Sequence, residues 1–437
     1  MVFNSIEFVI YFTIFFLIYW VILKRNLLFQ NYFLLIASCI FYAWWDWRFM
    51  ILLLGSTLFN YILGIKISEA SDESKKRIYL YLGVFQGVGL LVYFKYFNFF
   101  IASFTDLMNL IGFNSSYHTL KIILPLGISF YTFRTLSYLL DINNNKIKAS
   151  KNWLVFFNYV TFFPSLMSGP IDKAKPLISQ LEKLREFDYS KIVDGCRQVL
   201  WGLFKKLVIA DNCAPLANNI FSNYQNLSAS ELLLGSFYYT VQLYADFSGY
   251  SDMAIGFSKM IGFNISKNFD YPFFAQNISD YWRRWHISLT SWLTEYVFTP
   301  LSIWLRDLGD LGLILAIIIN IVVCGIWHGA NWTYVLFGFV HGCYFIPLIL
   351  KGTMNKKNKS SREALFPSLI EYKNIMLTFL LIILTNIIFR SNSCVESFLY
   401  YKKIFSLSLF TLPPSLFEET FIWVVLMFVA EWITLDS

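Results

Sequence analysis

The chain has 437 residues, of which 57% are hydrophobic, 20% aromatic and only 14% charged, and its formal net charge at pH 7 is +7. A soluble domain this apolar could not cover its surface with polar groups, so the composition excludes an ordinary soluble protein and indicates lipid as the solvent. The basic residues are spread over several loops rather than gathered on one face with aromatic residues, which argues against nucleic-acid binding.

Apolar runs long enough to cross a membrane recur along the whole chain. A helix that spans the hydrocarbon needs about 20 predominantly apolar residues. The sequence therefore predicts an all-α, polytopic integral membrane protein with about ten to twelve transmembrane helices, folded as a single membrane domain over residues 1–437. The runs are Val2–Leu23, Leu27–Trp45, Phe49–Ile67, Ile78–Phe104, Leu120–Leu140, Trp153–Ile171, Val193–Phe221, Leu232–Ile261, Leu311–Trp327, Trp332–Leu350, Ile375–Phe389 and Phe417–Ile433.

The charged residues between these runs predict the topology. The first run has span length and no basic leader, so we do not expect a cleavable signal peptide. The loops Thr105–Thr119 and Ser391–Glu396 contain no Lys or Arg. The positive-inside rule then places the amino terminus and these two loops outside the cytoplasm and the basic loops inside it. The basic clusters are Lys24–Arg25, Lys75–Arg77, Lys146–Lys151 and Lys351–Arg362.

Two of the apolar runs contain a charged residue or helix-breaking residues. Lys95 interrupts Ile78–Phe104, and Leu120–Leu140 contains Pro125 and Gly127. Irregular backbone at membrane depth is tolerated only where protein or a wet cavity surrounds it. We therefore expect re-entrant or tilted segments here.

The polar stretch Asp172–Ser190 has the spacing of an amphipathic helix. Its apolar residues recur at helical intervals, with charged residues between them: Leu177, Leu181, Leu184 and Phe187. Such a pattern predicts a helix that lies in the membrane interface, where it connects two spans.

A polar cluster, YADFSGYSD, lies within an otherwise apolar segment at Tyr244–Asp252. Because a buried carboxylate needs a partner, Asp246 is expected either to be paired for structural reasons or to act in the site. In the site it would orient a histidine or, as a substrate-binding residue, position the acceptor. Ser248, two residues later, is a candidate substrate-binding residue. The cationic partners considered for Asp246, besides a histidine, are Arg134, Arg283 and Arg284.

The stretch YWRRWHISLTSW, Tyr281–Trp292, places one of only four histidines among tryptophans and arginines. At about 100° per residue, a continuous helix over Trp282–Val297 would be amphipathic, with Arg284 on its polar face and His286 at the edge of its apolar face. Arg283 and Arg284 could then reach lipid headgroups or a carboxylate, and they are expected to anchor the helix or to attract an anionic substrate. Burial disfavours the charged imidazole, so His286 is expected to be neutral near pH 7 and able to accept a proton.

His328 lies in GIWHGANW, where an apolar span ends. An ionisable residue at such a depth is costly, so a functional site is the default interpretation, against the alternative of a histidine bonded to a backbone carbonyl. Its neighbours Trp327 and Asn331 are candidate substrate contacts. His341 is interpreted as structural, and His118 as a solvated loop residue.

These residues favour acyl transfer over other chemistry. The sequence shows no phosphate-binding glycine loop, zinc-binding HExxH or GxSxG motif, and its six cysteines are scattered. We therefore expect no bound metal or cofactor. A neutral histidine can take the proton from a hydroxyl as its oxygen attacks an activated acyl carbon.

Several long stretches of the sequence resemble the membrane-bound O-acyltransferase family, and within it the branch of alginate and peptidoglycan O-acetyltransferases. The two densest stretches cover residues 239–292, which include RRWHIS, and residues 325–342, GIWHGANWTYVLFGFVHG. Thr294-Glu295-Tyr296 stands where alginate-type members usually have Arg-Asp-Tyr, a departure that bears on the acceptor more than on the reaction. The other matching stretches are NYFLLIASCIFYAWWDWRFM (31–50), LPLGISFYTFRTLSYLLDI (124–142), FFPSLMSGPI (162–171) and VIADNCAPLANNIF (208–221).

The resemblance implies a ring of helices around a thin core, entered by a funnel from each side of a bacterial inner membrane. His328 matches the hallmark histidine of the family and is expected to be the general base, while His286 matches its second motif histidine and would hold or polarise a substrate. The expected reaction transfers an acyl group, most simply acetyl, to a hydroxyl of an extracytoplasmic polysaccharide. The donor would be acetyl-CoA or an acylated carrier protein.

Three alternatives remain open. The chain could transfer D-alanine from a carrier protein to teichoic acid. It could instead relay acetyl groups to a soluble periplasmic partner of the SGNH type, which would then modify the sugar. From a different class, a membrane transporter also fits broken helices and buried charge, although no inverted halves are apparent.

Overall fold

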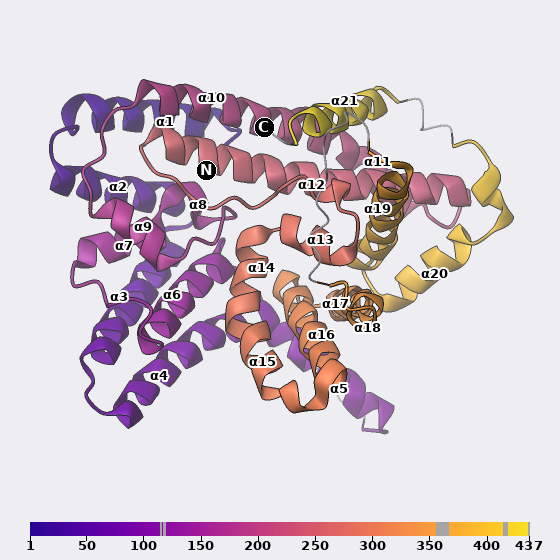
Figure 1. The fold of residues 1–437 in the computed structure, drawn as a ribbon, viewed down its shortest axis with the longest axis horizontal. Helices are drawn as coiled ribbons and strands as arrows, with labels where there is room; N and C mark the ends of the chain where they lie inside the picture. Colours follow the sequence, from indigo (N-terminus) through magenta and orange to yellow (C-terminus); the bar gives the residue numbers. More distant parts are fainter. Residues whose placement is uncertain (114–115, 117–118, 355–366, 414–417, 436–437) are drawn as a thin grey trace. The chain divides into compact units, whose positions relative to one another are not determined.

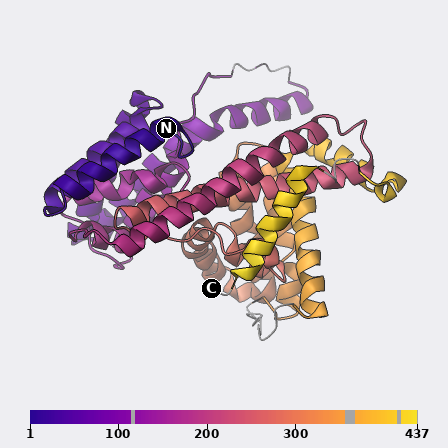
Figure 2. The same cartoon turned by 90° about the horizontal axis from the view of Figure 1, so that it is seen from above.

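The computed structural model describes residues 1–113, 116, 119–354, 367–413 and 418–435. His118 lies outside these residues. All regular elements in the described ranges are helices, as two views at right angles show (Figures 1 and 2). The predicted all-α class is therefore confirmed.

The chain divides into two compact units, Met1–Leu200 with Tyr250–Ser266 and Trp201–Gly249 with Lys267–Ser437. The single domain expected from the sequence stays a prediction. Two helices contribute residues to both units, α10 (Tyr189–Leu203) and α12 (Ala229–Met260).

Unit 1 packs its helices around aromatic side chains. Its helices α3, α4 and α6 pack against one another (Figure 1), and Phe8, Phe41 and Tyr159 are completely buried. Besides π-helical turns at Ile18–Ile22 and Val92–Tyr96, its helices are α1 (Ile6–Leu17), α2 (Leu27–Ala43), α3 (Trp47–Glu69), α4 (Glu73–Leu91), α5 (Phe97–Leu110), α6 (Ile128–Asn143), α7 (Trp153–Thr161), α8 (Phe163–Leu166) and α9 (Ala174–Leu181).

Unit 2 is built around the close packing of α16, α17 and α19. Its regular helices are α11 (Asp211–Ser222), α13 (Ile278–Arg284), α14 (Ile287–Leu293), α15 (Thr299–Trp304), α16 (Gly309–His328), α17 (Trp332–Cys343), α18 (Ile346–Leu350), α19 (Leu369–Arg390), α20 (Cys394–Ile404) and α21 (Glu419–Ile433). Phe204–Ala210 and Thr294–Phe298 are π-helical, and three short 3₁₀ turns complete the set: Pro272–Phe274, Arg306–Leu308 and Leu407–Phe410.

Five helical stretches in the described part of the chain are long and apolar enough to span a membrane: Trp47–Glu69, Glu73–Leu110, Arg306–His328, Trp332–Leu350 and Leu369–Arg390. Two shorter apolar helices, Ile6–Ile22 and Leu27–Ala43, are too short for this criterion. The protein is thus a multi-pass membrane protein, whereas the count of ten to twelve spans stays a prediction.

The irregular segments expected at membrane depth are partly visible. Lys95 lies in the π-helical turn that joins α4 to α5. The run Leu120–Leu140 is helical only from Ile128, because Gly127 adopts a left-handed φ of 71° at the start of α6. A Cβ at this glycine would lie 2.5 Å from the carbonyl oxygen of Leu166, so only glycine fits there.

The amphipathic helix predicted over Asp172–Ser190 is wrong in its length. Helix α9 ends at Leu181, and the chain stays irregular until α10 begins. Side chains of α2 bind this segment instead: Asn31 donates to the Leu181 carbonyl at 2.9 Å, and Gln30 donates to the Arg185 carbonyl at 3.2 Å. Because these long-range bonds satisfy backbone groups, the helix can end early.

Helices α16 and α17 approach closely through glycines. A Cβ at Gly325 would lie 2.1 Å from the Tyr334 carbonyl oxygen, and one at Gly338 would lie 2.6 Å from that of Ile321. Neither carbonyl can yield without moving a helix, so each glycine is needed for the packing.

We expect Gly325→Ala to destabilise the protein by about 1–3 kcal/mol, because the added methyl group overpacks the α16–α17 contact. The matched control is Gly55→Ala in α3, where nothing lies within 4 Å of the added Cβ. That change should be neutral or stabilise by up to about 1 kcal/mol through helix propensity. Thermal unfolding of both purified variants in detergent measures the difference, and equal midpoints would contradict the expectation.

Candidate active site

His286 lies at a break between two short helices rather than within one. Helix α13 ends at Arg284 and α14 begins at Ile287, and His286 itself adopts a left-handed conformation with φ 44° and ψ 53°. The continuous helix predicted over Trp282–Val297 is therefore wrong. A non-glycine residue in this region is strained and needs surrounding contacts to hold it.

Asn268 supplies those contacts. The Ile287 amide donates to the Asn268 carbonyl at 2.8 Å, and the Ser288 hydroxyl donates to Asn268 Oδ1 at 2.6 Å. His286 Nδ1 lies 3.3 Å from the same Oδ1. Because an amide oxygen can only accept, Nδ1 must carry the hydrogen, which leaves a lone pair on Nε2 of the neutral ring.

The His286 side chain is completely buried. Phe247 and Trp327 contact its ring, with centroids 4.6 and 5.5 Å away. Nε2 has no hydrogen-bond partner among the described residues. Burial lowers the pKa of His286 well below its ordinary value, and the nearby His328 lowers it further. The imidazole is thus neutral at pH 7, with an acceptor atom available to a substrate.

His328 is the last residue of α16 and is half-buried. Its ring lies 4.9 Å from that of Trp327 and 5.0 Å from that of Phe389 in α19. Trp327 therefore contacts both histidines, and the structure brings His286, Trp327 and His328 together. His341 is surrounded by other rings, those of Tyr281, Trp282, Phe337 and Tyr344.

The other polar residues predicted for the site have defined positions. Ser248 is buried, and its hydroxyl has no partner among the described residues. Asn331 caps α17 by accepting from the Thr333 amide at 3.1 Å and donates to the Asn392 carbonyl at 2.9 Å. Asn331 thus fixes the turn after His328 to the end of α19.

Within the described ranges, Asp246 pairs with none of the partners that the sequence suggested. Its carboxylate lies 2.7 Å from the ammonium of Lys206, which also binds Asp211 at 2.9 Å. The Asp246 side chain is 53% exposed. The structure thus supports the structural pairing of Asp246, not contact with a histidine.

The two arginines of the motif bind their own surroundings. Arg284 donates to Asp280 at 2.9 Å, one turn earlier in α13. Arg283 donates to the Ser279 hydroxyl at 3.1 Å and to the Met354 carbonyl at 2.7 Å. They anchor α13, and these contacts use donors of the two guanidinium groups that were also expected to reach headgroups or an anionic substrate.

Sequence reasoning missed Asn268. It lies 18 residues before His286 in the irregular segment that precedes α13. The one available signal was a polar residue within the densest stretch of family resemblance, and no periodicity singles it out. In the described ranges, no group of three or more His, Cys, Asp or Glu residues could hold a metal ion.

Asn268→Ala removes the acceptor of both His286 Nδ1 and the Ser288 hydroxyl. We expect it to lower the turnover of the site by roughly three- to tenfold, the cost of the bond that orients His286. Asn268→Asp should instead keep the bond and, by adding a negative charge, raise the pKa of His286. The acid limb of the pH–rate profile would then move to higher pH. A merely structural role for Asn268 would lower activity without this shift.

The comparisons with known proteins agree with one another. A family profile described as MBOAT, membrane-bound O-acyltransferase family, matches residues 145–388. A probable alginate O-acetylase of Pseudomonas aeruginosa is 36% identical over 86% of this chain and 70% of its own length. A peptidoglycan O-acetyltransferase of Helicobacter pylori is 38% identical over 73% and 64%, and a teichoic acid D-alanyltransferase of Streptococcus thermophilus is 30% identical over 59% and 67%.

Proposed function

Because the chain belongs to the membrane-bound O-acyltransferase family and is an O-acyltransferase, we propose that it transfers an acetyl group from a cytoplasmic-side donor to a hydroxyl of an extracytoplasmic polysaccharide. The acceptor is of the alginate or peptidoglycan type, as in relatives that are 36% and 38% identical. The enzyme lies in the inner membrane of a bacterium.

The observation that carries this proposal is that the rings of His286 and His328 both contact the indole ring of Trp327. His328 is half-buried and accessible, so it acts as the general base. It takes the proton of the acceptor hydroxyl while the oxygen attacks the acyl carbon, and it returns the proton to the leaving group when the acyl–donor bond breaks. Base catalysis of this kind contributes about 10²–10⁴-fold, and positioning of the two substrates supplies much of the remainder.

His286 has a different role because its tautomer is fixed. With Nδ1–H directed at Asn268, its Nε2 accepts a hydrogen bond from an N–H or O–H group of a substrate. The buried hydroxyl of Ser248 is a second group that would bind a substrate. Trp327 lies between the two histidines and contacts both rings. Asn331 positions the turn that carries His328.

The donor is acetyl-CoA or an acylated carrier protein, used as a co-substrate. Transfer of D-alanine to teichoic acid is the second candidate, favoured by the D-alanyltransferase relative but over a smaller share of the chain. A relay through a soluble SGNH-type partner and a transport function are further alternatives that the same experiment separates.

The test uses the purified chain in lipid vesicles with labelled acetyl-CoA inside and oligosaccharides of alginate or peptidoglycan outside. Label in the oligosaccharide supports direct acetyl transfer. Label that appears only after a soluble acetyltransferase partner is added would replace direct transfer by the relay. Labelling only with D-alanyl carrier protein and teichoic acid, or passage of intact substrate without transfer, would overturn the proposal.

A further inference from the structure

Arg390, the last residue of α19, is a half-buried cation that contacts no carboxylate among the described residues. Its Nη2 donates to Asn218 Oδ1 at 2.9 Å. Its guanidinium lies over the rings of Phe221 and Tyr239, 5.5 and 5.9 Å from their centroids. The bond to Asn218 uses one of five N–H donors, so the fork can still bind a planar anion.

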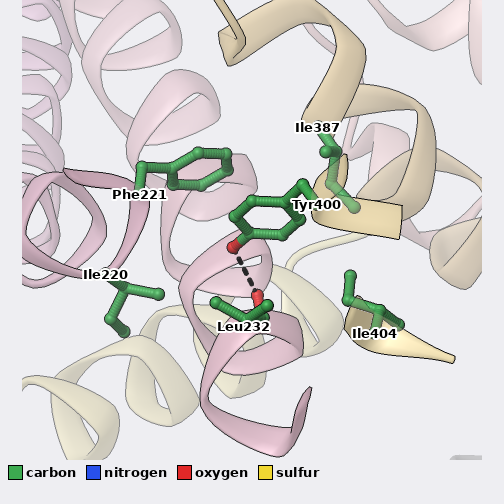
Figure 3. Close-up of a cluster of buried hydrophobic side chains, with 6 residues drawn as sticks. All are labelled: Ile220, Phe221, Leu232, Ile387, Tyr400 and Ile404. Atoms are coloured by element: carbon green, nitrogen blue, oxygen red, sulfur yellow. Dashed lines mark hydrogen bonds between the residues drawn. The ribbon is translucent and has the colours of Figure 1, made fainter. Parts of the chain in front are cut away.

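The surface beneath Arg390 is rigid. Phe221 stacks on Tyr400 with centroids 4.8 Å apart, and the Tyr400 hydroxyl donates to the Leu232 carbonyl at 2.8 Å (Figure 3). Both rings belong to a buried cluster contributed by α11, α12, α19 and α20 (Figure 3). A guanidinium stacked on fixed aromatic rings loses little further freedom when it binds a ligand.

This cation lies beside the catalytic end of α16. The preceding residue, Phe389, contacts the ring of His328, and Asn331 is bonded to the backbone of Asn392. The ends of α16 and α19 are therefore joined next to Arg390. The topology predicted from the sequence places this end outside the cytoplasm, the side from which the polysaccharide arrives.

A purely structural reading explains Arg390 poorly. A half-buried arginine needs acceptors or a counter-charge, because withdrawal of the charge from water is costly. Arg390 has one such acceptor, Asn218 Oδ1. Among the described residues no ion pair involves Arg390, in contrast to Arg284, which pairs with Asp280. The positive-inside rule also disfavours a basic residue at the outer end of a span.

We propose that Arg390 binds the carboxylate of an acidic sugar in the acceptor polysaccharide and so places a neighbouring hydroxyl at His328. This inference rests on the proposed function and narrows its acceptor to a carboxylate-bearing glycan. Arg390 is thus a specificity-determining residue for acyl transfer.

The test compares two acceptors that differ only in charge: an oligouronate, and the same oligosaccharide with its carboxyl groups reduced to hydroxymethyl groups. Arg390→Gln is expected to raise the KM for the oligouronate by roughly ten- to a hundredfold, with little change for the neutral oligosaccharide. Arg390→Lys keeps the charge but not the forked guanidinium group. Its KM for the oligouronate should therefore lie between those of the wild-type protein and Arg390→Gln.

The matched control is Arg306→Gln. Arg306 lies before the opposite end of α16, pairs with Asp307, and has a side chain that is 76% exposed. Its replacement should change neither KM. Equal losses on both acceptors, no loss on either, or a raised KM for the acyl donor alone would overturn the proposal. If Arg390→Gln does not fold, Arg390→Lys alone must still show a raised KM for the charged acceptor and an unchanged KM for the neutral one.

Direct binding of a fluorescent oligouronate, without acyl donor, separates this inference from the proposed function. If wild-type protein binds the oligouronate but transfers no acyl group, the proposed function fails. If wild-type protein transfers acyl groups and Arg390→Gln binds the oligouronate equally well, the role of Arg390 fails.

Discussion

His328→Ala is expected to lower the rate of acyl transfer by about 10²–10⁴-fold, the contribution of a general base. The loss should fall on kcat rather than on KM, because His328 accepts the proton only as the new bond forms. The measurement is acyl transfer by the purified variant in vesicles at saturating donor and acceptor. His328→Gln, which keeps the volume but cannot take a proton at neutral pH, should be as inactive.

The matched control for this loss is His341→Phe. His341 is buried among aromatic rings, the nearest being that of Phe337 at 4.5 Å. Its Nδ1 has no hydrogen-bond partner among the described residues, so phenylalanine sacrifices no bond there. That variant should retain the rate of the wild-type enzyme. Full activity in His328→Ala, or an equal loss in His341→Phe, would contradict the assignment.

The two histidines that we propose for catalysis should not contribute independently. His286→Ala removes a substrate contact. Residues that act as a unit lose activity together. The double variant His286→Ala/His328→Ala should therefore be slower than His328→Ala by no more than the loss of that one contact. If His286→Ala abolishes kcat while His328→Ala raises only KM, the roles of the two imidazoles are exchanged. The lone pair that Asn268 leaves on His286 Nε2 makes this outcome chemically possible.

The elements that sequence could predict are those set by local periodicity and by residues with restricted backbone. The apolar runs predict the spans Trp47–Glu69, Trp332–Leu350 and Leu369–Arg390 closely. Pro125 and Gly127 mark the irregular part of the run Leu120–Leu140, and α6 begins at Ile128, directly after Gly127. The early end of α9 depends on the hydrogen bonds of Gln30 to Arg185 and of Asn31 to Leu181. These bonds join residues that are 155 and 150 positions apart in the sequence. No local pattern contains that information.

The same distinction explains the site. His328 is visible in the sequence because an ionisable residue ends an apolar span. The left-handed turn at His286 cannot be seen in the sequence. Trp282, Leu289 and Leu293 are buried, as they would be on one face of a continuous helix, although the helix breaks between Trp282 and Leu289. The partner of Asp246 was missed because Lys206 comes from the π-helical turn Phe204–Ala210, which no helical wheel brings to it. Tertiary contacts decide such positions.

Arg134→Met is expected to destabilise unit 1 by about 3–5 kcal/mol, because it leaves a buried carboxyl without its cation. Arg134 is completely buried and lies 3.7 Å from Asp172. It also donates to the carbonyls of Tyr159, Val160, Ser165 and Pro170 and to the hydroxyl of Ser165. Thermal or denaturant unfolding in detergent measures the loss. Arg48→Gln, which breaks an exposed pair with Asp46, is the control and should cost less than about 1 kcal/mol.

The loss in Arg134→Met should depend on pH. Burial raises the pKa of Asp172 above its ordinary value even though Arg134 opposes this, and removal of the cation raises it further. A carboxyl with a raised pKa binds more protons in the folded state than in the unfolded state, so folding stability falls as pH rises through that pKa. Arg134→Met should therefore be more stable at pH 5 than at pH 8. Adding Asp172→Asn should remove the pH dependence and recover only part of the stability, since the carbonyls that Arg134 bonded stay unsatisfied. A loss that is the same at both pH values would show that packing and carbonyl bonding, rather than the charge of Asp172, account for the burial of Arg134.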